Sequence, residues 1–350
     1  MSMDSVFLDR NENNYGPAPA CFEVLRAAGI DAMSWYSKDF ARGVKSVLSE
    51  RLARDHGVSE AWLQLGYGSE DILKQAVHFY LQKAETLLIP THSWWYYKSI
   101  AAETGGRTLE YAMTPGTEAF HYDVEGLLRL AREHRPRIVL ISSPNNPTGN
   151  TLSDDDLRRV IRELREPVVI LDQAYWGFGG GGTAPLADLV AENPRLVILR
   201  TFSKFYALAG LRIGYGVLGR DLGDLVRNST RYLGYNRLSE RVALAALDSG
   251  DYYAEIRRRM IEEKAFYERE LNLIPGFKVY RSEANFVLAD VPPRFKGDLK
   301  ADLTRQGLII KFFKNEPFLD DCVRITIGTS EQNRRLIKAI SAFARERGLL

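Results

Sequence analysis

The side chain with the clearest chemical potential in this sequence is a lysine within an apolar and aromatic segment. Lys204 follows a short apolar run at 196–200 and stands among Phe202, Phe205 and Tyr206. Removal from water disfavours the charged form of an amine, so a lysine in such surroundings can act as a nucleophile. The competing interpretation is a surface lysine whose stem covers apolar neighbours while its charge remains in water.

Groups that suit a phosphate flank this lysine, and a second set occurs upstream. Thr201, Ser203 and Arg212 offer two hydroxyls and a guanidinium, a donor set that matches phosphate oxygens. Gly68 and Ser69 stand at the start of an acidic helical segment. A glycine there lets the backbone approach an anion, and a helix N-terminus offers free N–H groups. A plain glycine loop with a serine cap would give the same upstream pattern.

Two further polar motifs come directly after predicted strands. Asp172 ends the apolar run 168–172, and Tyr175 follows three positions later. A buried aspartate is costly unless it is paired, so Asp172 either caps a helix or pairs with a cationic heterocycle. The motif Ser-Pro-Asn-Asn-Pro-Thr-Gly at 143–149 follows the run 137–142, and α/β proteins bind ligands at the carboxyl ends of such strands. Its prolines and glycine fix the backbone and aim an amide side chain.

These motifs need a scaffold, and the alternation of short apolar runs with helical patterns predicts one. Apolar runs rich in β-branched residues are typical of buried parallel strands, and they lie at 86–90, 137–142, 168–172 and 196–200. Helical patterns lie between them at 69–81, 96–104 and 153–164. Ser153 followed by three aspartates is a good helix start. This order predicts an α/β domain over about residues 40–240.

The last third of the chain changes character. A long helical stretch at 239–271, bent near 249–250, precedes four predicted strands and a closing helix. The strands are expected at 277–280, 284–288, 308–312 and 323–327, and the helix at 330–347. This is an α+β pattern, so we expect a second, smaller domain from about residue 245. Four consecutive glycines at 179–182 predict a flexible loop.

Composition excludes several classes of protein. The 350 residues include 47 Lys plus Arg and 45 Asp plus Glu, so the net charge is +2, and 45% are hydrophobic. These values exclude a disordered chain and give no basic footprint for nucleic acid or an anionic membrane surface. No apolar run approaches the ~20 residues of a membrane span, and the N-terminal residues do not resemble a secretory signal. We therefore expect neither nucleic acid nor a membrane as a partner.

The cysteines and histidines indicate no disulfide framework and no metal site. Cys21 and Cys322 stand near opposite ends of the chain, a spacing typical of neither a disulfide-rich domain nor a zinc site. The histidines apart from His92 are scattered and lack metal-binding spacing. The sequence therefore predicts a protein of the reducing cytoplasm that binds no metal.

Together the four motifs resemble the fold-type I aminotransferases, which use pyridoxal 5′-phosphate (PLP). Two terminal segments narrow the resemblance to the histidinol-phosphate aminotransferase branch. They are Leu-Asp-Arg-Asn-Glu-Asn-Asn-Tyr-Gly-Pro at 8–17 and Val-Arg-Ile-Thr-Ile-Gly-Thr at 323–329. The resemblance covers about residues 6–345, nearly the whole chain, and the order and spacing of the motifs match throughout.

The resemblance implies a fold and an activity. The fold would be the PLP-dependent transferase fold type I, with a mostly parallel seven-stranded sheet between helices in a large domain at 36–244. A small α+β domain would combine both chain ends, 1–35 and 245–350. The activity would be transamination in amino-acid biosynthesis, between an amino donor (an amino acid or an amino-alcohol phosphate) and a keto acceptor.

Other functions remain as alternatives to transamination. The first is a PLP enzyme of specialised biosynthesis with other chemistry, such as a decarboxylase similar to threonine-phosphate decarboxylase, an oxidase, a cyclase or a lyase. A PLP-binding protein without turnover is disfavoured, because all the matched catalytic positions are present. A dinucleotide-binding dehydrogenase is disfavoured too, because the glycines at 66–68 lack a third partner and follow no clear strand.

Residue by residue, the resemblance assigns roles around the cofactor. Lys204 matches the lysine that forms the internal aldimine and shuttles the substrate's α-proton. Asp172 matches the carboxylate that keeps the pyridine nitrogen protonated and so makes the ring an electron sink. Asn146 and Tyr175 match the pair that hydrogen-bonds the cofactor's phenolic oxygen. The expected phosphate-binding residues are Gly68, Ser69, Thr201, Ser203 and Arg212.

Further matches concern the substrate and the neighbouring subunit. Tyr36 matches a tyrosine that reaches the cofactor phosphate of the neighbouring subunit, which implies a homodimer with shared active sites. Arg324 matches the arginine that binds the substrate's acid group, a carboxylate or a phosphate. Tyr15 and Asn13 lie on the N-terminal segment that closes over the substrate. His92 occupies the position of the aromatic ring that lies flat on the cofactor.

Four positions depart from the branch pattern. His92 stands where Tyr, Phe or Trp is usual. Its ring can stack and can also titrate near neutral pH, or it is simply a loop residue beside core tryptophans. Asn14 stands where proline is common, Gln173 where glutamate is common, and Tyr67 where asparagine is common. None of these departures removes the expected PLP machinery.

Overall fold

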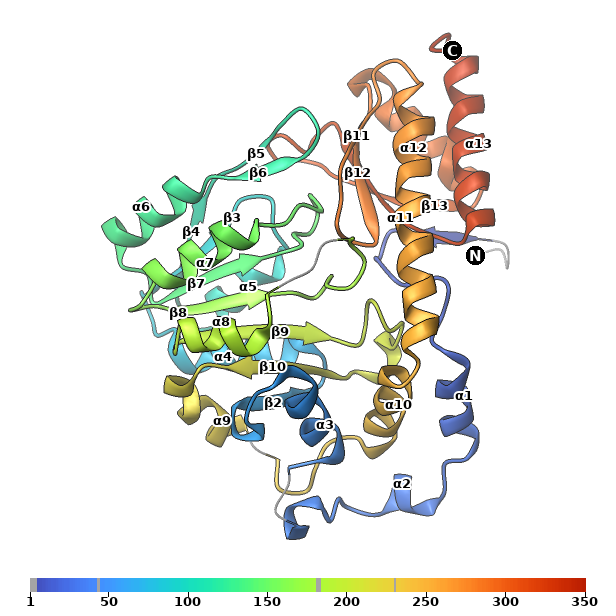
Figure 1. The fold of residues 1–350 in the computed structure, drawn as a ribbon. Coiled ribbons are helices and arrows are strands. Elements are labelled where there is room, and N and C mark those ends of the chain that lie inside the picture. Colours follow the sequence, from blue (N-terminus) through green and yellow to red (C-terminus); the bar gives the residue numbers. More distant parts are fainter. Residues whose placement is uncertain (1–4, 43–44, 181–183, 230) are drawn as a thin grey trace.

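A seven-stranded sheet forms the centre of the computed structural model, which describes residues 5–42, 45–180, 184–229 and 231–350 (Figure 1). Its strand order is β2-β10-β9-β8-β7-β3-β4, and β10 alone runs antiparallel to its neighbours. The predicted fold class, a mostly parallel sheet flanked by helices, is confirmed. The strands are β2 (Leu63–Gly66), β3 (Thr86–Pro90), β4 (Arg107–Tyr111), β7 (Ile138–Ser142), β8 (Val168–Asp172), β9 (Leu196–Thr201) and β10 (Gly214–Leu218).

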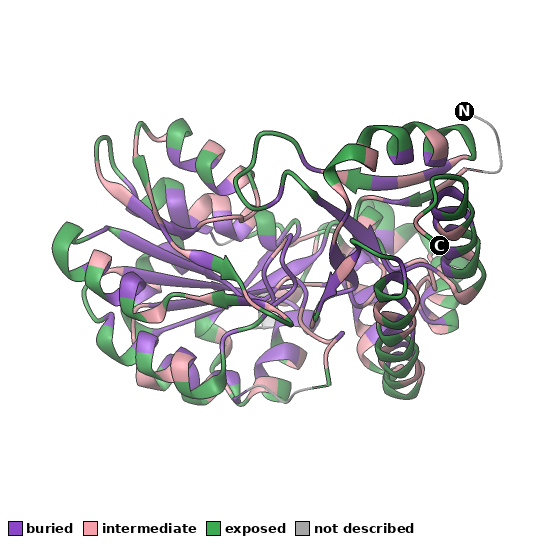
Figure 2. Cartoon of the chain, turned by 90° about the horizontal axis from the view of Figure 1, so that it is seen from above, coloured by how far each residue is buried: buried purple, intermediate pink, exposed green. Residues whose placement is uncertain are grey.

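Both faces of this sheet are buried. Successive side chains of a strand point to opposite sides, so each strand contributes residues to both faces. Ile138 and Leu140 pack against the helices of one face, whereas Val139 and Ile141 pack against those of the other. Figure 2 shows the strands buried between helices with exposed outer surfaces. The first face is covered by α4 (Ser69–Tyr80), α5 (Tyr96–Glu103) and α9 (Gly223–Ser229). The second is covered by α3 (Val47–His56), α6 (Val124–His134), α7 (Asp154–Glu163) and α8 (Leu186–Glu192).

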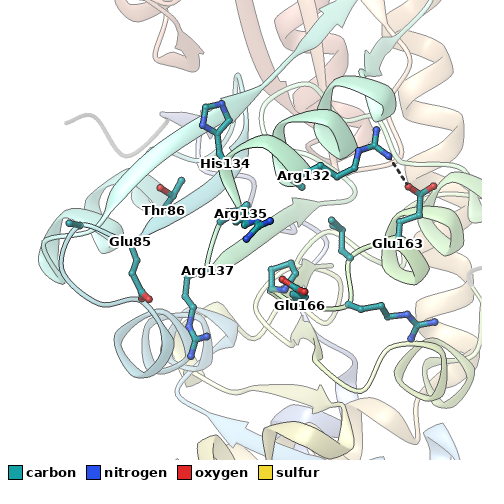
Figure 3. Close-up of a pocket in the computed structure, with 14 residues that line it drawn as sticks. Glu85, Thr86, Arg132, His134, Arg135, Arg137, Glu163 and Glu166 are labelled. Carbon is teal, nitrogen blue, oxygen red and sulfur yellow. Dashed lines mark ion pairs between the residues drawn. The ribbon is translucent and has the colours of Figure 1, made fainter.

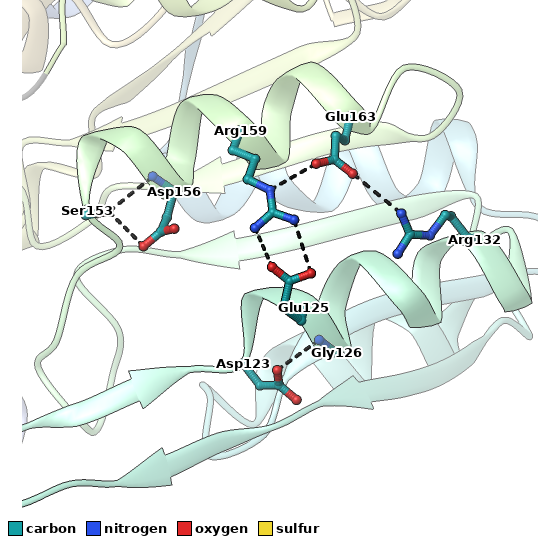
Figure 4. Close-up of polar contacts among 8 residues, drawn as sticks. All are labelled: Asp123, Glu125, Gly126, Arg132, Ser153, Asp156, Arg159 and Glu163. Atoms are coloured by element: carbon teal, nitrogen blue, oxygen red, sulfur yellow. Dashed lines mark hydrogen bonds and ion pairs between the residues drawn. The ribbon is translucent and has the colours of Figure 1, made fainter.

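Helix α7 shows what fixes a helix on this scaffold. Ser153 caps its start, as predicted, by accepting a hydrogen bond from the N–H of Asp156. On its outer face Arg159 pairs with Glu125 of α6 and with Glu163 of its own helix (Figure 4). Pairs this exposed add little stability. The apolar stripe that α7 buries against the sheet therefore holds the helix in place.

A second sheet combines the two ends of the chain. Its order is β1-β13-β14-β12-β11, and β1 pairs in parallel with β13. The strands are β1 (Val6–Leu8), β11 (Lys278–Tyr280), β12 (Phe286–Asp290), β13 (Leu308–Phe312) and β14 (Cys322–Thr326). Its helices are α11 (Gly250–Asn272), α12 (Lys296–Arg305) and α13 (Ser330–Glu346). The predicted α+β character of the last third is thus present, and the exact domain boundaries stay a prediction.

The remaining elements connect the two sheets. Helices α1 (Pro19–Arg26) and α2 (Ile30–Ser34) form an N-terminal arm along α10 (Arg237–Leu247). A hairpin of β5 (Met113–Pro115) and β6 (Phe120–Tyr122) packs against the second sheet. Short 3₁₀ helices lie at Asp39–Arg42, Glu60–Trp62, Ala209–Leu211, Arg220–Leu222 and Pro293–Phe295. Among the described residues, no helix is long and apolar enough to cross a membrane.

The structure adds strands that the sequence analysis did not predict. β2, β4 and β10 were missed, and β2 ends at Gly66, so the glycines at 66–68 do follow a strand. These strands are short or contain glycine and polar residues, so they lack a contiguous apolar run. Of the predicted glycine-rich loop, residues 181–183 lie outside the described residues.

Candidate active site

A cavity of about 500 Å³ lies where the carboxyl ends of the central strands meet the second sheet. Asp172 ends β8 and Thr201 ends β9, while Gly68 follows β2; parallel strands bring such ends to one edge. Arg324 reaches the cavity from β14 of the second sheet. Ten of the predicted site residues line this cavity: Gly68, Ser69, Asn146, Asp172, Tyr175, Thr201, Ser203, Lys204, Arg212 and Arg324.

Asp172 is a buried carboxylate with two hydrogen-bond donors. It is 5% exposed. Its Oδ1 accepts a hydrogen bond from the Ala174 N–H, and its Oδ2 accepts one from the Tyr97 hydroxyl, both at 2.9 Å. Burial raises the pKa of Asp172, and the hydrogen bonds from Tyr97 and Ala174 oppose that rise. The side chain therefore does not cap a helix, and it can pair with a cationic group in the cavity.

Lys204 points into the cavity from the loop after β9. Its Nζ donates a hydrogen bond to the Arg10 carbonyl at 3.1 Å and lies 5.7 Å from the centre of the Tyr175 ring. No ion pair of Lys204 occurs within the described residues. Tyr175 in turn accepts a hydrogen bond from Asn11 Nδ2 at 3.0 Å. The amine thus lies in the cavity rather than on the outer surface.

The backbone before α4 forms a cradle for an anion. Gly68 has a φ of +88°, and a Cβ there would lie 2.9 Å from Arg212 Nη2. Arg212 holds this turn by donating a hydrogen bond to the Tyr67 carbonyl at 3.2 Å. Thr201 and Ser203 hydrogen-bond each other at 3.0 Å. This donor set of backbone N–H groups, hydroxyls and a guanidinium fits the phosphate of PLP.

Arg324 is the buried cation at the other end of the cavity. It is 9% exposed. Its Nη2 donates a hydrogen bond to the Asp9 carbonyl at 2.6 Å, and its Nη1 contacts Asn146 Oδ1. Its buried Nε has no hydrogen-bond partner among the described residues. Burial lowers the pKa of Arg324, so this site favours an anionic ligand that would restore the missing partner.

Four predicted site residues do not line the cavity. The His92 ring packs edge-on against Phe120 and Phe318, at centroid distances of 6.3 and 5.9 Å. The Asn13 amide donates a hydrogen bond to the Phe205 carbonyl at 2.9 Å. The remaining two are Tyr15, whose buried hydroxyl lacks a hydrogen-bond partner within the described residues, and Tyr36, which is exposed on the N-terminal arm.

Other lining residues were missed by the sequence analysis. Arg10, Trp94, Tyr97 and Lys311 all line the cavity. Lys311 lies directly opposite Arg324 in the β13–β14 pair, so strand pairing was the signal that would have found it. Trp94 belongs to an aromatic run that the sequence shows plainly, and no sequence feature marks Tyr97 as a partner of Asp172.

A larger cavity, of about 930 Å³, lies at the amino ends of the same strands (Figure 3). Arginines and glutamates line it, and Arg132 pairs there with Glu163 at 3.7 Å. None of the predicted site residues lies in it. Because ligands of α/β sheets bind at the carboxyl ends of strands, we assign the active site to the smaller cavity.

The cradle makes a prediction about Gly214, which opens β10 beside it. A Cβ at this position would lie 2.4 Å from Ser69 N and 2.6 Å from Gly68 C, both main-chain atoms. We expect Gly214→Ala to weaken PLP binding about tenfold or more, since overpacking costs about 1–3 kcal/mol. Titration of the apoenzyme with PLP, followed by tryptophan fluorescence, measures this affinity.

Gly210→Ala is the matched control, because a Cβ there meets no atom within 4 Å. It should bind PLP like the unchanged protein. Normal affinity in a folded Gly214→Ala protein would contradict the assignment of the cradle to the phosphate.

Comparisons with known proteins identify the family of this chain. The family model for class I and II aminotransferases matches residues 5–340. The histidinol-phosphate aminotransferase of Roseiflexus castenholzii is 32% identical over 347 residues, which cover 97% of this chain and 90% of the relative. That of Caldanaerobacter subterraneus is 31% identical over 335 residues, covering 95% and 91%.

Solved structures share the fold. The histidinol-phosphate aminotransferase of Sinorhizobium meliloti, in complex with pyridoxal-5′-phosphate, superposes with a TM-score of 0.86 at 24% identity and covers 97% of this chain and 91% of that one. The enzyme of Clostridium acetobutylicum also gives a TM-score of 0.86, at 22% identity, and covers 97% and 99%. With a family match that spans nearly its whole length, this chain belongs to the class I and II aminotransferases, as a PLP enzyme of fold type I in the histidinol-phosphate aminotransferase-like branch.

Proposed function

We propose that this aminotransferase acts on an amino compound with an anionic group remote from the reacting amine, and that histidinol phosphate is the first candidate. The observation that carries the proposal is the buried Nε of Arg324, which has no hydrogen-bond partner among the described residues. Relatives of this chain at about 30% identity are named histidinol-phosphate aminotransferases. Their names support histidinol phosphate over other anionic amines.

Two further cations support an anionic substrate. Lys311 is the strand partner of Arg324, and directly opposed residues present their side chains on the same face of a sheet. Arg10 follows β1, which pairs with the edge of β13 that faces away from β14. Neither Lys311 nor Arg10 forms an ion pair with a carboxylate within the described part of the chain. Like charges gathered in a cavity repel one another until an anion binds.

Residues of this chain would divide the work around the cofactor. When bound, PLP supplies an electron-withdrawing ring that stabilises the negative charge left on a deprotonated α-carbon. Asp172 would hold the ring nitrogen, and the cradle around Gly68 and Arg212 would hold the phosphate. Lys204 would take the proton from the substrate α-carbon and return it, and acid–base help of this kind is worth about 10²–10⁴-fold in rate.

The aromatic ring that stacks on the cofactor is reassigned from the residues that line the cavity. The sequence analysis predicted that His92 lies flat on the cofactor ring, but His92 packs outside the cavity lining. Trp94 lines the cavity, and its ring meets Tyr97 edge-on at a centroid distance of 5.7 Å. We therefore assign the stacking contact to Trp94, because an indole offers a large apolar face.

We also propose that the enzyme is a homodimer. On the N-terminal arm Ile30, Met33, Trp35 and Tyr36 are 54–73% exposed, and an apolar patch of this kind marks an interaction surface. A second copy of the chain would cover it and would receive Tyr36 at its phosphate cradle. The alternative occupant, a different protein, would leave the enzyme monomeric when pure.

The proposal extends to the domains and the compartment. A large domain at 36–244 and a small one from 1–35 and 245–350 are supported by the two sheets, which draw their strands from these segments. Cys21 and Cys322 are free and buried, which supports the predicted cytoplasmic location.

Incubation with a panel of amines tests the function. The panel contains histidinol phosphate, glutamate, aromatic and basic amino acids, and O-phosphothreonine, each with 2-oxoglutarate or another keto acid as acceptor. We expect one donor to yield its keto product and the amino form of the acceptor, identified by mass spectrometry. Lys204→Ala should lower this rate by about 10²–10⁴-fold. Release of carbon dioxide without amino transfer would instead support the alternative decarboxylase chemistry.

Lys311→Ala tests the nature of the substrate. We expect the KM for histidinol phosphate to rise about 10–100-fold, because a charge-assisted hydrogen bond of about 1.5–3 kcal/mol is lost. The KM for histidinol, which lacks the phosphate, should stay the same. Lys300→Ala on α12, where the lysine is exposed, is the control and should change neither value. Equal KM changes for both substrates would argue against a phosphate contact.

The oligomeric state tests the role of the arm. Sedimentation equilibrium should give twice the mass of the chain, and Met33→Asp should shift the protein toward monomers and lower its activity. Leu350→Asp changes an equally apolar, exposed residue at the other end of the chain and should leave the dimer intact. A monomer with full activity would refute the shared site.

A further inference from the structure

A tyrosine that no sequence motif singled out is bonded to the central carboxylate of the site. Tyr97 is the second residue of α5, and its hydroxyl donates a hydrogen bond to Asp172 Oδ2 at 2.9 Å. It is the one side chain that hydrogen-bonds Asp172 among the described residues; the second donor is the Ala174 main chain. Tyr97 also lines the cavity.

The surroundings of Tyr97 keep its hydroxyl a donor. The residue is 2% exposed, and its ring packs in the core between the sheet and α4 and α5. Burial and the charge of Asp172 raise the pKa of Tyr97 well above its ordinary value. The phenol therefore stays protonated near neutral pH. Its hydrogen then stabilises the ionised form of the neighbouring carboxyl.

Two other buried tyrosines, on β4 and at the end of α4, make no such contact. The Tyr111 hydroxyl donates a hydrogen bond to the Leu140 carbonyl at 3.2 Å, which merely satisfies a polar group. The Tyr80 hydroxyl has no hydrogen-bond partner within the described residues. Only Tyr97 of these three directs its hydroxyl to an ionisable group in the active-site cavity.

We propose that Tyr97 is a positioning residue of the active site, which fixes the orientation of the Asp172 carboxylate and keeps it ionised for the cofactor's ring nitrogen. The inference rests on the role proposed for Asp172. Each carboxylate oxygen accepts one hydrogen bond, and the two donors belong to different segments of the chain. Both donors thus prevent its rotation and leave its remaining lone pairs for a cationic partner.

Other charged groups of the cavity do not substitute for Tyr97. The same cavity is lined by the phenol of Tyr175 and by seven other charged side chains: Asp9, Arg10, Glu70, Lys204, Arg212, Lys311 and Arg324. No hydrogen bond or ion pair joins any of them to Asp172 in the described part of the chain. Without Tyr97, one oxygen of a carboxylate that is 5% exposed would lose its donor.

Tyr97→Phe removes the hydroxyl and keeps the ring, so it tests this role directly. We expect the dissociation constant of PLP, measured by fluorescence titration of the apoenzyme, to rise about 10–100-fold, as the loss of a hydrogen bond to a charged group implies. In the holoenzyme, the cofactor's visible absorption band changes with pH, and we expect the midpoint of that change to move upward. A ring that is less firmly protonated withdraws less electron density, so the titrating group loses its proton at a higher pH. Tyr111→Phe is the matched control and should change neither value.

A double-mutant cycle separates positioning from packing. If Tyr97 acts through Asp172, Tyr97→Phe should add no loss of PLP affinity in an Asp172→Asn background. An unshifted pH midpoint with normal PLP affinity, or the same loss of affinity in both backgrounds, would overturn the proposal. Neither readout involves an amine substrate, so a wrong substrate assignment would leave both results unchanged.

Discussion

A carboxylate that is buried and yet must stay charged is the constraint on which this active site depends. Burial alone would favour the neutral acid at Asp172. Two hydrogen-bond donors oppose this effect of burial, and each requires a particular path of the chain. The chain turns directly after β8, which brings the Ala174 N–H to Asp172, and the first turn of α5 brings the Tyr97 hydroxyl to the end of β8. The pairing of β8 with β7 and β9 then brings the other polar strand ends to the same edge.

The electrostatics of the site are local and do not follow from the charge of the whole chain. The net charge is only +2, whereas the cavity gathers five cationic side chains against three carboxylates: Arg10, Lys204, Arg212, Lys311 and Arg324 against Asp9, Glu70 and Asp172. The surplus lies on the Arg324 side, because Arg212 at the phosphate cradle pairs with Glu70 at 3.5 Å. A ligand with an acid group at that end matches this distribution.

Much of this arrangement could be predicted from the sequence, because contiguous apolar runs mark the inner strands β7, β8 and β9, and the polar motifs follow them at once. Contacts that depend on strand pairing or backbone direction could not. Lys311 enters the site only because β13 pairs with β14. His92 leaves it because its backbone, at a φ of 50°, turns the ring toward Phe120 and Phe318. Tyr97 has no sequence signal, since its partner lies 75 positions away.

The parallel pairing of β1 with β13 also sets an order of assembly during synthesis. The cradle, Asp172 and Lys204 all come from residues up to Arg212, so the central sheet can collect them while the chain is still growing. The first strand, however, must wait for Leu308–Phe312, and Arg324 comes later still. A ribosome-bound chain that has emerged only through β10 therefore contains the residues of the cofactor end but lacks Lys311 and Arg324, so the cavity is complete only once the final segment has been made.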